Sequence, residues 1–298
     1  MQLSLVVNAC PLSSAQPSDR VPWWSFTKTA LAATALTLVR DGLIGLDDQL
    51  AEGPFTLRQL LRHEAGLADY GELSDYHAAV ARHDTPWLAE DMLQRLDATR
   101  LRYPPGTGWR YSNVGYLYVV RLIERTTSLA LACALQQRLF APLGISQVRL
   151  AATPVDLHGV HLGSIANYHP GWVYHGLLVG PLSEAALLLE RVMTGDLLPD
   201  ELLQTMQTAR ALGGPIPGRP WASPGYALGL MKGGLENGVI LCGHTGAGPG
   251  SVIAVYHQAQ GERTASCAVF AAGADQNIVE AEVARQLAAS LAEDERGG

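Results

Sequence analysis

The apolar residues change their spacing about two thirds of the way along the chain, and this change limits the folds that the chain can adopt. The middle of the sequence has helical spacing, whereas the C-terminal part has short apolar runs separated by Gly-containing turns, at residues 226–231, 239–242, 251–257 and 265–271. An amphipathic pattern over residues 277–292 predicts a closing helix. The sequence therefore predicts a mixed α/β fold in which a helix-rich region precedes a sheet.

The first helix is the most clearly marked, because Ser25 to Arg40 is rich in Ala and Leu and contains no Gly or Pro. Asp41 and Gly42 follow, and glycine is the usual left-handed residue after the end of a helix. Further helices are expected at residues 56–63 with Thr56 as N-cap, 87–96, 114–124, 129–140, 183–193 and 199–208, a strand at 2–10, and irregular structure at 151–175.

The chain has 298 residues, of which 48% are hydrophobic and 16% charged, so it is long enough for one large domain or two closely packed ones. The net charge is -7, and the sequence contains no cluster of Lys and Arg that would follow a phosphate backbone. Nucleic acid is therefore not expected as a partner. No apolar run approaches the roughly 20 residues that a membrane span needs.

Four cysteines, Cys10, Cys133, Cys242 and Cys267, are widely spaced and form no C-x-x-C pair. We expect free, mostly buried thiols, which suit a reducing compartment. The N-terminus has a short apolar run at residues 3–7 but no basic residue before Arg20, so it lacks the pattern of a secretory signal. These features favour a cytoplasmic protein over a periplasmic one.

Lysine is rare in this chain, since only Lys28 and Lys232 are lysines among the 21 Lys and Arg residues. Arginine keeps its proton in a protein, whereas a lysine can lose its proton when its pKa is lowered. A lysine retained in a chain that otherwise uses arginine suggests a function in proton transfer.

Lys28 also lies three residues after Ser25, in an S-x-x-K pattern at the start of the predicted helix. Residues i and i+3 share one face of a helix, so the serine hydroxyl and the lysine amine can meet. A serine hydroxyl needs an adjacent base to become a good nucleophile, and a partly desolvated lysine can be that base. The first N–H groups of the helix would stabilise a developing oxyanion. The alternative interpretation is a serine N-cap beside an unrelated surface lysine.

A second pattern, Tyr111-Ser112-Asn113, follows a Pro- and Gly-rich loop and precedes a predicted helix. A tyrosine there can project into a cleft, and a neighbouring ammonium would lower the phenol pKa so that the tyrosine relays protons. The Asn113 amide can bond both a substrate carbonyl and the lysine. The alternative is a tyrosine packed on the core, with Asn113 as a helix cap.

A third pattern, Gly243-His244-Thr245-Gly246-Ala247-Gly248, follows an apolar run. Glycines let a backbone approach a ligand closely, and an edge strand there can offer N–H and C=O groups to an acyl substrate. The alternative is a Gly-rich hairpin turn.

Together, the order and spacing of the three patterns resemble the serine β-lactamase and penicillin-binding-protein superfamily, which carries S-x-x-K and K-T-G motifs. The likeness is greatest to its class C-like branch of esterases and D-aminopeptidases, which has Y-x-N and often H-x-G. It extends over residues 21–290, and includes the stretches 56–67, 103–106 and 224–230.

The resemblance implies an α/β fold with an antiparallel sheet flanked by helices, with a sheet domain at 1–45 and 180–298 and an inserted helical domain at 46–179. It implies that Ser25 attacks an ester or amide carbonyl, with Lys28 and Tyr111 sharing the general-base role. Tyr111 would then protonate the leaving group and activate the water that hydrolyses the acyl-enzyme. Backbone N–H groups of Ser25 and Ala247 would form the oxyanion hole.

By the same resemblance, the substrate is expected to contact Asn113, His244, Thr245, Gly246, Ala247, Trp172 and Tyr174. For Trp172 and Tyr174, an equally good interpretation is that they cover the core. His244 stands where many β-lactamases have lysine, and histidine is mostly neutral near pH 7. It would bind a substrate carboxylate weakly, so a small ester or amide is a more natural substrate than a penicillin.

Two further features complete the expectations. Only 24 residues precede Ser25, which leaves room for about one strand where the family usually has two, so a shortened sheet or a truncated chain is expected. His158, His161, His169 and His175 are near one another in sequence, but without H-E-x-x-H or another convergent ligand pattern we expect no metal.

The expected function is therefore hydrolysis of a small carboxylic ester, amide or β-lactam through an acyl-enzyme, without a cofactor. A D-amino-acid peptidase, an acyltransferase of the same family, and a non-catalytic binding protein on this fold remain alternatives. The sequence leaves the natural substrate and the oligomeric state open.

Overall fold

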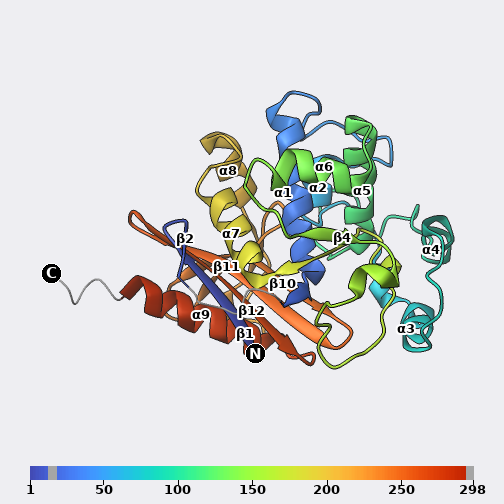
Figure 1. Cartoon of the computed structure of the whole chain (residues 1–298). Helices are drawn as coiled ribbons and strands as arrows, with labels where there is room; N and C mark the ends of the chain where they lie inside the picture. The colour runs from blue at the N-terminus through green and yellow to red at the C-terminus, as the bar shows by residue number, and fades with distance from the viewer. Residues whose placement is uncertain (13–18, 293–298) are drawn as a thin grey trace.

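An antiparallel sheet forms the centre of the protein in the computed structural model, which describes residues 1–12 and 19–292 (Figure 1). Its strands lie in the order β2 (Cys10–Pro11), β1 (Gln2–Val7), β12 (Arg263–Ala272), β11 (Ser251–Gln260), β10 (Ile240–Gly248), β9 (Met231–Leu235), β8 (Gly225–Tyr226) and β6 (Arg210–Ala211), and β7 (Trp221–Ser223) also pairs with β9. A smaller antiparallel sheet joins β3 (Arg20–Pro22), β5 (Leu177–Pro181) and β4 (Arg149–Ala151) in that order.

Helices cover the main sheet on both faces and also build the region beside it. Figure 1 shows α9 along one face, with α1 and α7 on the other. The α-helices are α1 (Thr27–Arg40), α2 (Leu57–Leu61), α3 (Ser74–Ala81), α4 (Ala89–Arg95), α5 (Asn113–Thr127), α6 (Leu131–Leu135), α7 (Leu182–Met193), α8 (Asp200–Gln207) and α9 (Gln276–Ala292). Shorter helical turns are η1 (Trp24–Phe26), η2 (Tyr70–Glu72), the π-helical η3 (Gln136–Phe140), η4 (Pro154–Leu157) and η5 (Pro170–Trp172). The predicted mixed fold with an antiparallel sheet flanked by helices is confirmed.

The strand β11 shows how the sequence allows a sheet to be buried on both faces. Ile253 and Val255 belong to the core that contains α1 and α7, whereas Val252, Ala254 and Tyr256 belong to the core beneath α9. Successive side chains of a strand point to opposite faces. A strand buried on both faces is therefore apolar throughout and does not alternate, which explains the continuous apolar runs in the C-terminal part of the sequence.

Helix α1 is buried along most of its length, from Thr27 to Leu38. It packs against α5, α6 and η3, and its small alanines allow these neighbours to approach closely. Two of its buried hydroxyls bond within the helix, because Thr34 donates to the Ala30 carbonyl at 2.8 Å and Thr37 donates to the Thr34 carbonyl at 2.7 Å. The Thr29 hydroxyl instead donates to the Gly229 carbonyl at 2.7 Å, outside the helix. Consequently a polar side chain on α1 is held away from bulk water.

The strand predicted at residues 226–231 is wrong, because these residues mostly form the turn between β8 and β9. Gly229 has a φ of 73°, which is left-handed backbone that glycine adopts easily, and the Ala227 N–H donates to the Leu230 carbonyl at 2.7 Å. A Cβ on Gly229 would lie 2.3 Å from the Cβ of Ala32 on α1. The run is apolar because the turn packs against α1, which the sequence pattern alone did not distinguish from a strand.

The Gly-rich stretch at 243–248 belongs to a strand and not to a hairpin turn. β10 continues to Gly248, which pairs with Ser251 of β11. Other elements lie near their expected places, although the first helix begins as η1 and becomes α-helical only at Thr27. Helix α3 and strand β5 were not predicted from the sequence. The division into a sheet domain and a helical domain stays a prediction.

All four cysteines are free, but only Cys242 and Cys267 are buried, whereas Cys10 and Cys133 are exposed. The expectation of mostly buried thiols is therefore correct for half of them. Among residues 1–12 and 19–292, no helix combines the length and the apolar character that crossing a membrane requires.

A buried carboxylate connects α7 to the sheet. Glu190 accepts hydrogen bonds from the hydroxyls of Ser266, at 2.7 Å, and Thr264, and its Oε2 lies 3.0 Å from Nδ1 of His257. Burial alone would raise the pKa of Glu190, but the hydrogen bonds from these three side chains outweigh it and lower the pKa. The carboxylate therefore stabilises the contact between α7, β11 and β12.

We predict that Glu190→Ala lowers the free energy of unfolding by about 3 kcal/mol, because it leaves buried polar groups without their acceptor. Urea denaturation followed by circular dichroism would measure the change. Glu201→Ala, at an exposed position of α8, is the matched control and should alter stability by less than about 0.5 kcal/mol. Equal denaturation midpoints for the two variants would contradict this role of Glu190.

Candidate active site

Ser25 lies in η1, directly before α1, where the backbone is under strain. Its neighbour Trp24 has a φ of 40°, a region that bulky residues rarely adopt. The surroundings hold Trp24 there, since the side chain is buried and its indole N–H donates to the Ser251 hydroxyl at 3.1 Å. The strained turn presents Ser25 at the rim of a cavity of about 330 Å³ that its side chain helps to line.

The amine of Lys28 lies beneath Ser25 and is fully buried. Its Nζ is 3.3 Å from Ser25 Oγ, 2.7 Å from Asn113 Oδ1 and 3.1 Å from Nε2 of His175. Burial lowers the pKa of Lys28 to about 7, although the charge of Asp69 opposes this shift. A substantial fraction of Lys28 is therefore neutral near pH 7 and able to accept a proton.

Tyr111 reaches the same serine from the loop before α5. Its hydroxyl donates to Ser25 Oγ at 2.8 Å, and Lys28 Nζ lies 5.0 Å from the centre of its ring. The expected lowering of the phenol pKa is wrong, because burial raises the pKa of Tyr111 instead. The lysine amine is itself partly neutral, so it provides little positive charge to stabilise a phenolate.

Asn113 is the first residue of α5, which Ser112 caps by accepting a hydrogen bond from the Gly115 N–H at 3.2 Å. Asp69 fixes the orientation of the Asn113 amide, because its Oδ1 accepts from both the backbone N–H and the side-chain Nδ2 at 3.0 Å. The amide oxygen is thereby turned toward Lys28. The helix cap of this motif is therefore Ser112 and not Asn113, and the Asn113 amide oxygen is available to contact Lys28.

The C-terminal half of β10 lies against the turn that carries Ser25. β9 pairs with β10 only from Ile240 to Gly243, so in the described part of the chain no strand covers that side of β10 beyond Gly243. A Cβ on Gly246 would lie 2.7 Å from the backbone N of Ser25. Ala247 is exposed and lines the cavity together with Ser25. The strand therefore brings backbone groups next to Ser25.

Two predicted substrate contacts, His244 and Thr245, do not line this cavity. His244 is buried, with Nε2 2.9 Å from the Tyr226 hydroxyl and Nδ1 2.7 Å from the Thr245 carbonyl, and burial lowers its pKa to about 3. Thr245 lies on the opposite face of β10, where it bonds Tyr256 at 2.8 Å and the carboxylate of Glu280 on α9. With its pKa lowered in this way, His244 offers no positive charge to a substrate carboxylate near pH 7.

Trp172 and Tyr174 lie behind the cavity wall and do not line it. Trp172 packs against Tyr76 and Trp87, and Tyr174 packs against Tyr70. The cavity is instead lined by Tyr70 of η2 and by Tyr76 and Val80 of α3, together with Tyr168, Val173 and His175. Trp172 also lines a neighbouring, larger cavity, so substrate contact by these two residues stays a prediction beside the interpretation that they cover the core.

Several residues of the site escaped the sequence analysis. Asp69 and His175 contact the Asn113 and Lys28 side chains, Tyr226 bonds His244, and Nδ1 of His63 accepts from the Ser112 N–H at 3.1 Å. Asp69 and His175 stand in no motif, whereas His63 and Tyr226 lie in the stretches 56–67 and 224–230, to which no role was assigned. The irregular segment around His175 was recognised, but nothing in the sequence places that histidine at Lys28.

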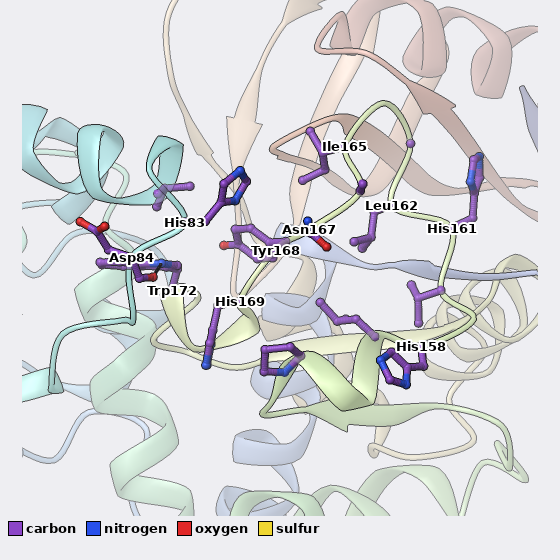
Figure 2. Close-up of a pocket in the computed structure, with 16 residues that line it drawn as sticks. His83, Asp84, His158, His161, Leu162, Ile165, Asn167, Tyr168, His169 and Trp172 are labelled. Atoms are coloured by element: carbon purple, nitrogen blue, oxygen red, sulfur yellow. Dashed lines mark hydrogen bonds between the residues drawn. The ribbon is translucent and has the colours of Figure 1, made fainter.

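A second and larger cavity, of about 670 Å³, adjoins the first and shares Val80 and Tyr168 with it. Figure 2 shows that its histidines, among them His158, His161 and His169, come from separate stretches of the loop wall and do not converge. Within the described ranges, no group of three or more His, Cys, Asp or Glu side chains is placed to hold a metal ion.

Comparison with known proteins agrees with this fold. The family described as Beta-lactamase matches residues 12–293, so the chain belongs to the Beta-lactamase family of hydrolases. A D-aminopeptidase of Brucella ovis is 30% identical over 141 residues, which are 45% of this chain and 27% of that protein. A penicillin-binding protein of Bacillus subtilis is 28% identical over 135 residues, 42% of this chain and 29% of that protein. The matches thus span less than a third of these relatives.

Solved structures show the same fold over nearly the whole chain. A D-stereospecific amidohydrolase from Streptomyces sp. superposes with a TM-score of 0.74 at 24% identity, covering 94% of this chain and 92% of the other. The D-amino acid amidase of Ochrobactrum anthropi SV3 complexed with D-phenylalanine gives a TM-score of 0.76 at 19% identity, covering 99% and 94%. At this identity the likeness concerns the fold.

We predict that Gly246→Ala slows labelling of Ser25 by a fluorophosphonate at least about tenfold, because the added methyl group would displace the Ser25 backbone. Intact-mass spectrometry would follow the labelling. Gly214→Ala, where a Cβ meets no atom within 4 Å, is the matched control and should label like the wild type. Unchanged labelling of the Gly246 variant would mean that β10 does not define the geometry at Ser25.

Proposed function

We propose that the protein is a serine hydrolase that cleaves amides or short peptides of D-amino acids through an acyl-enzyme on Ser25. The observation that carries the catalytic part is the contact of Ser25 Oγ with both a buried lysine amine, at 3.3 Å, and a tyrosine hydroxyl, at 2.8 Å. The amine has a pKa of about 7, which suits a general base near neutral pH.

In the proposed reaction, neutral Lys28 takes the proton of Ser25 as Oγ attacks the carbonyl carbon. Backbone N–H groups of Ser25 and Ala247 stabilise the oxyanion. Tyr111 gives its proton to the leaving nitrogen and recovers one from the Lys28 ammonium, while the C–N bond breaks and the amine departs. Lys28 is then neutral again. A water molecule attacks the acyl-enzyme, its proton passes through Tyr111, and Ser25 leaves as the hydroxyl.

The electrostatics of the site favour substrates that carry no carboxylate group. His244 is neutral and buried, so it offers no charge to a penicillin carboxylate. The named relatives include a D-aminopeptidase and two D-specific amidases, which supports D-amino acid derivatives above simple esters. The wall formed by Tyr70, Tyr76 and Val173 is suited to an apolar side chain.

We predict that kcat/KM rises with pH through about 7 and then levels off, because Lys28 must be neutral to accept the serine proton. Raising the pH removes the proton, so activity increases as pH passes upward through the lysine pKa. Lys28→Arg should abolish this activity at every pH, since arginine keeps its proton. Lys232→Arg, at the other lysine of the chain, is the matched control and should retain the wild-type profile. A flat profile in the wild type would contradict the role of Lys28.

We predict that D-phenylalanine amide is hydrolysed at least about tenfold faster than its L-enantiomer, with p-nitrophenyl butyrate and a penicillin as further probes. Intact-mass spectrometry should detect an acyl adduct that Ser25→Ala abolishes and that the exposed Ser74→Ala retains. Ester turnover without turnover of either amide would redirect the proposal to an esterase. Neither turnover nor an adduct in a folded sample would support the non-catalytic binding protein.

A further inference from the structure

The imidazole of His175 is the third group around the lysine amine, and the catalytic scheme does not yet use it. His175 lies between η5 and β5, is buried, and places Nε2 3.1 Å from Lys28 Nζ. Its other nitrogen, Nδ1, is buried without a hydrogen-bond partner among the described residues. A buried polar atom without a partner is costly, so its retention calls for a reason.

The number of hydrogens on the Lys28 amine limits which hydrogen bonds it can make with His175. A neutral amine has two N–H groups and one lone pair, and Nζ contacts Ser25 Oγ, Asn113 Oδ1 and His175 Nε2. The Asn113 oxygen can only accept, so it takes one N–H. If His175 Nε2 accepts the second N–H, the lone pair is left for the proton of Ser25.

The opposite tautomer of His175 does not fit the reaction. A proton on Nε2 would point at the lone pair of neutral Lys28 and compete with the Ser25 hydroxyl for it. Once Lys28 is charged, that proton would face an ammonium proton. With the proton on Nδ1, Nε2 accepts from Lys28 in both states. Burial, and next to it the charge of Lys28, holds the pKa of His175 well below its ordinary value, so the ring is neutral and can accept.

We propose that His175 is a positioning residue that, as the Nδ1–H tautomer, accepts a hydrogen bond from Lys28 and so directs the lysine lone pair to Ser25. After proton transfer, the three protons of the ammonium match three acceptors, namely Ser25 Oγ, Asn113 Oδ1 and His175 Nε2. His175 thus accepts a hydrogen bond from Lys28 both before and after the lysine takes the proton of Ser25. The inference rests on the proposed function of Ser25 and Lys28.

Other titratable groups facing this pair must be considered in any pH experiment. Tyr111 and Tyr116 present their rings to Lys28, at 5.0 and 5.5 Å from Nζ to the ring centres. The charge of Asp69 raises the pKa of Lys28, and the more distant His63 and His244 act on His175. None of these groups is altered by substitutions at His175, so a shift between variants reports on His175 itself.

The test compares His175→Phe with His175→Gln, whose side-chain oxygen can accept from the lysine in place of Nε2. The rate of fluorophosphonate labelling of Ser25 is measured between pH 5 and 10 by intact mass. His175→Phe should label at least about tenfold more slowly on the alkaline plateau, and its acid limb should move to lower pH, because an acceptor that stabilises the ammonium is lost. His175→Gln should recover most of the rate and the wild-type limb.

His158→Phe, at an exposed position of the same loop region, is the matched control and should label like the wild type. Melting temperatures of all variants identify any loss of fold. A His175→Phe variant that folds and keeps the wild-type rate and limb would overturn the proposal. So would a slow His175→Gln variant, since it would indicate that His175 itself carries the proton. Absence of labelling in the wild type would instead refute the proposed function of Ser25.

Discussion

The burial of one amine, that of Lys28, is the constraint on which the rest of the site depends. Removing an ammonium from water is unfavourable, so the protein lowers the pKa of this lysine to about 7. α1 provides the dry position, because almost the entire helix is surrounded by other elements. Asn113 accepts a hydrogen bond from the amine, and Asp69 orients the Asn113 amide for this contact. Ser25 Oγ lies within hydrogen-bonding distance of the same amine.

Much of the fold could be predicted because the relevant signals are local. The apolar runs of β11 and β12, the Ala- and Leu-rich α1 and the Thr56 cap are properties of short segments. Errors arose where tertiary packing produced the same pattern as secondary structure. The stretch 226–231 is apolar because its turn packs on α1, and α3 is too short and too exposed to show a helical period.

The residues of the site could likewise be predicted where they belong to a local motif. Ser25, Lys28, Tyr111 and Asn113 belong to short motifs, and the structure brings them together. His175 and Asp69 do not, because a single polar residue in an irregular segment gains its meaning only from what the fold places beside it. The direction of the Tyr111 pKa was also missed, since the sequence suggests a nearby charge but not the depth of burial that outweighs it. Likewise, the face of β10 on which Thr245 lies is decided by strand register.

Beyond Gly243, the edge of β10 that faces away from β11 pairs with no strand in the described part of the chain, and this has a consequence for how the substrate preference of such a scaffold can change. Main-chain N–H and C=O groups are the same whatever side chains a strand carries. A ligand aligned with this edge would therefore bond to groups that side-chain substitutions leave in place, except that proline removes the N–H. Selectivity then resides in the facing wall, where Tyr70, Tyr76 and Val80 come from η2 and α3, outside the sheet. Main-chain binding and side-chain selectivity are thus encoded in separate parts of the chain. Ligand preference can therefore change by substitution while the framework around Ser25 stays the same.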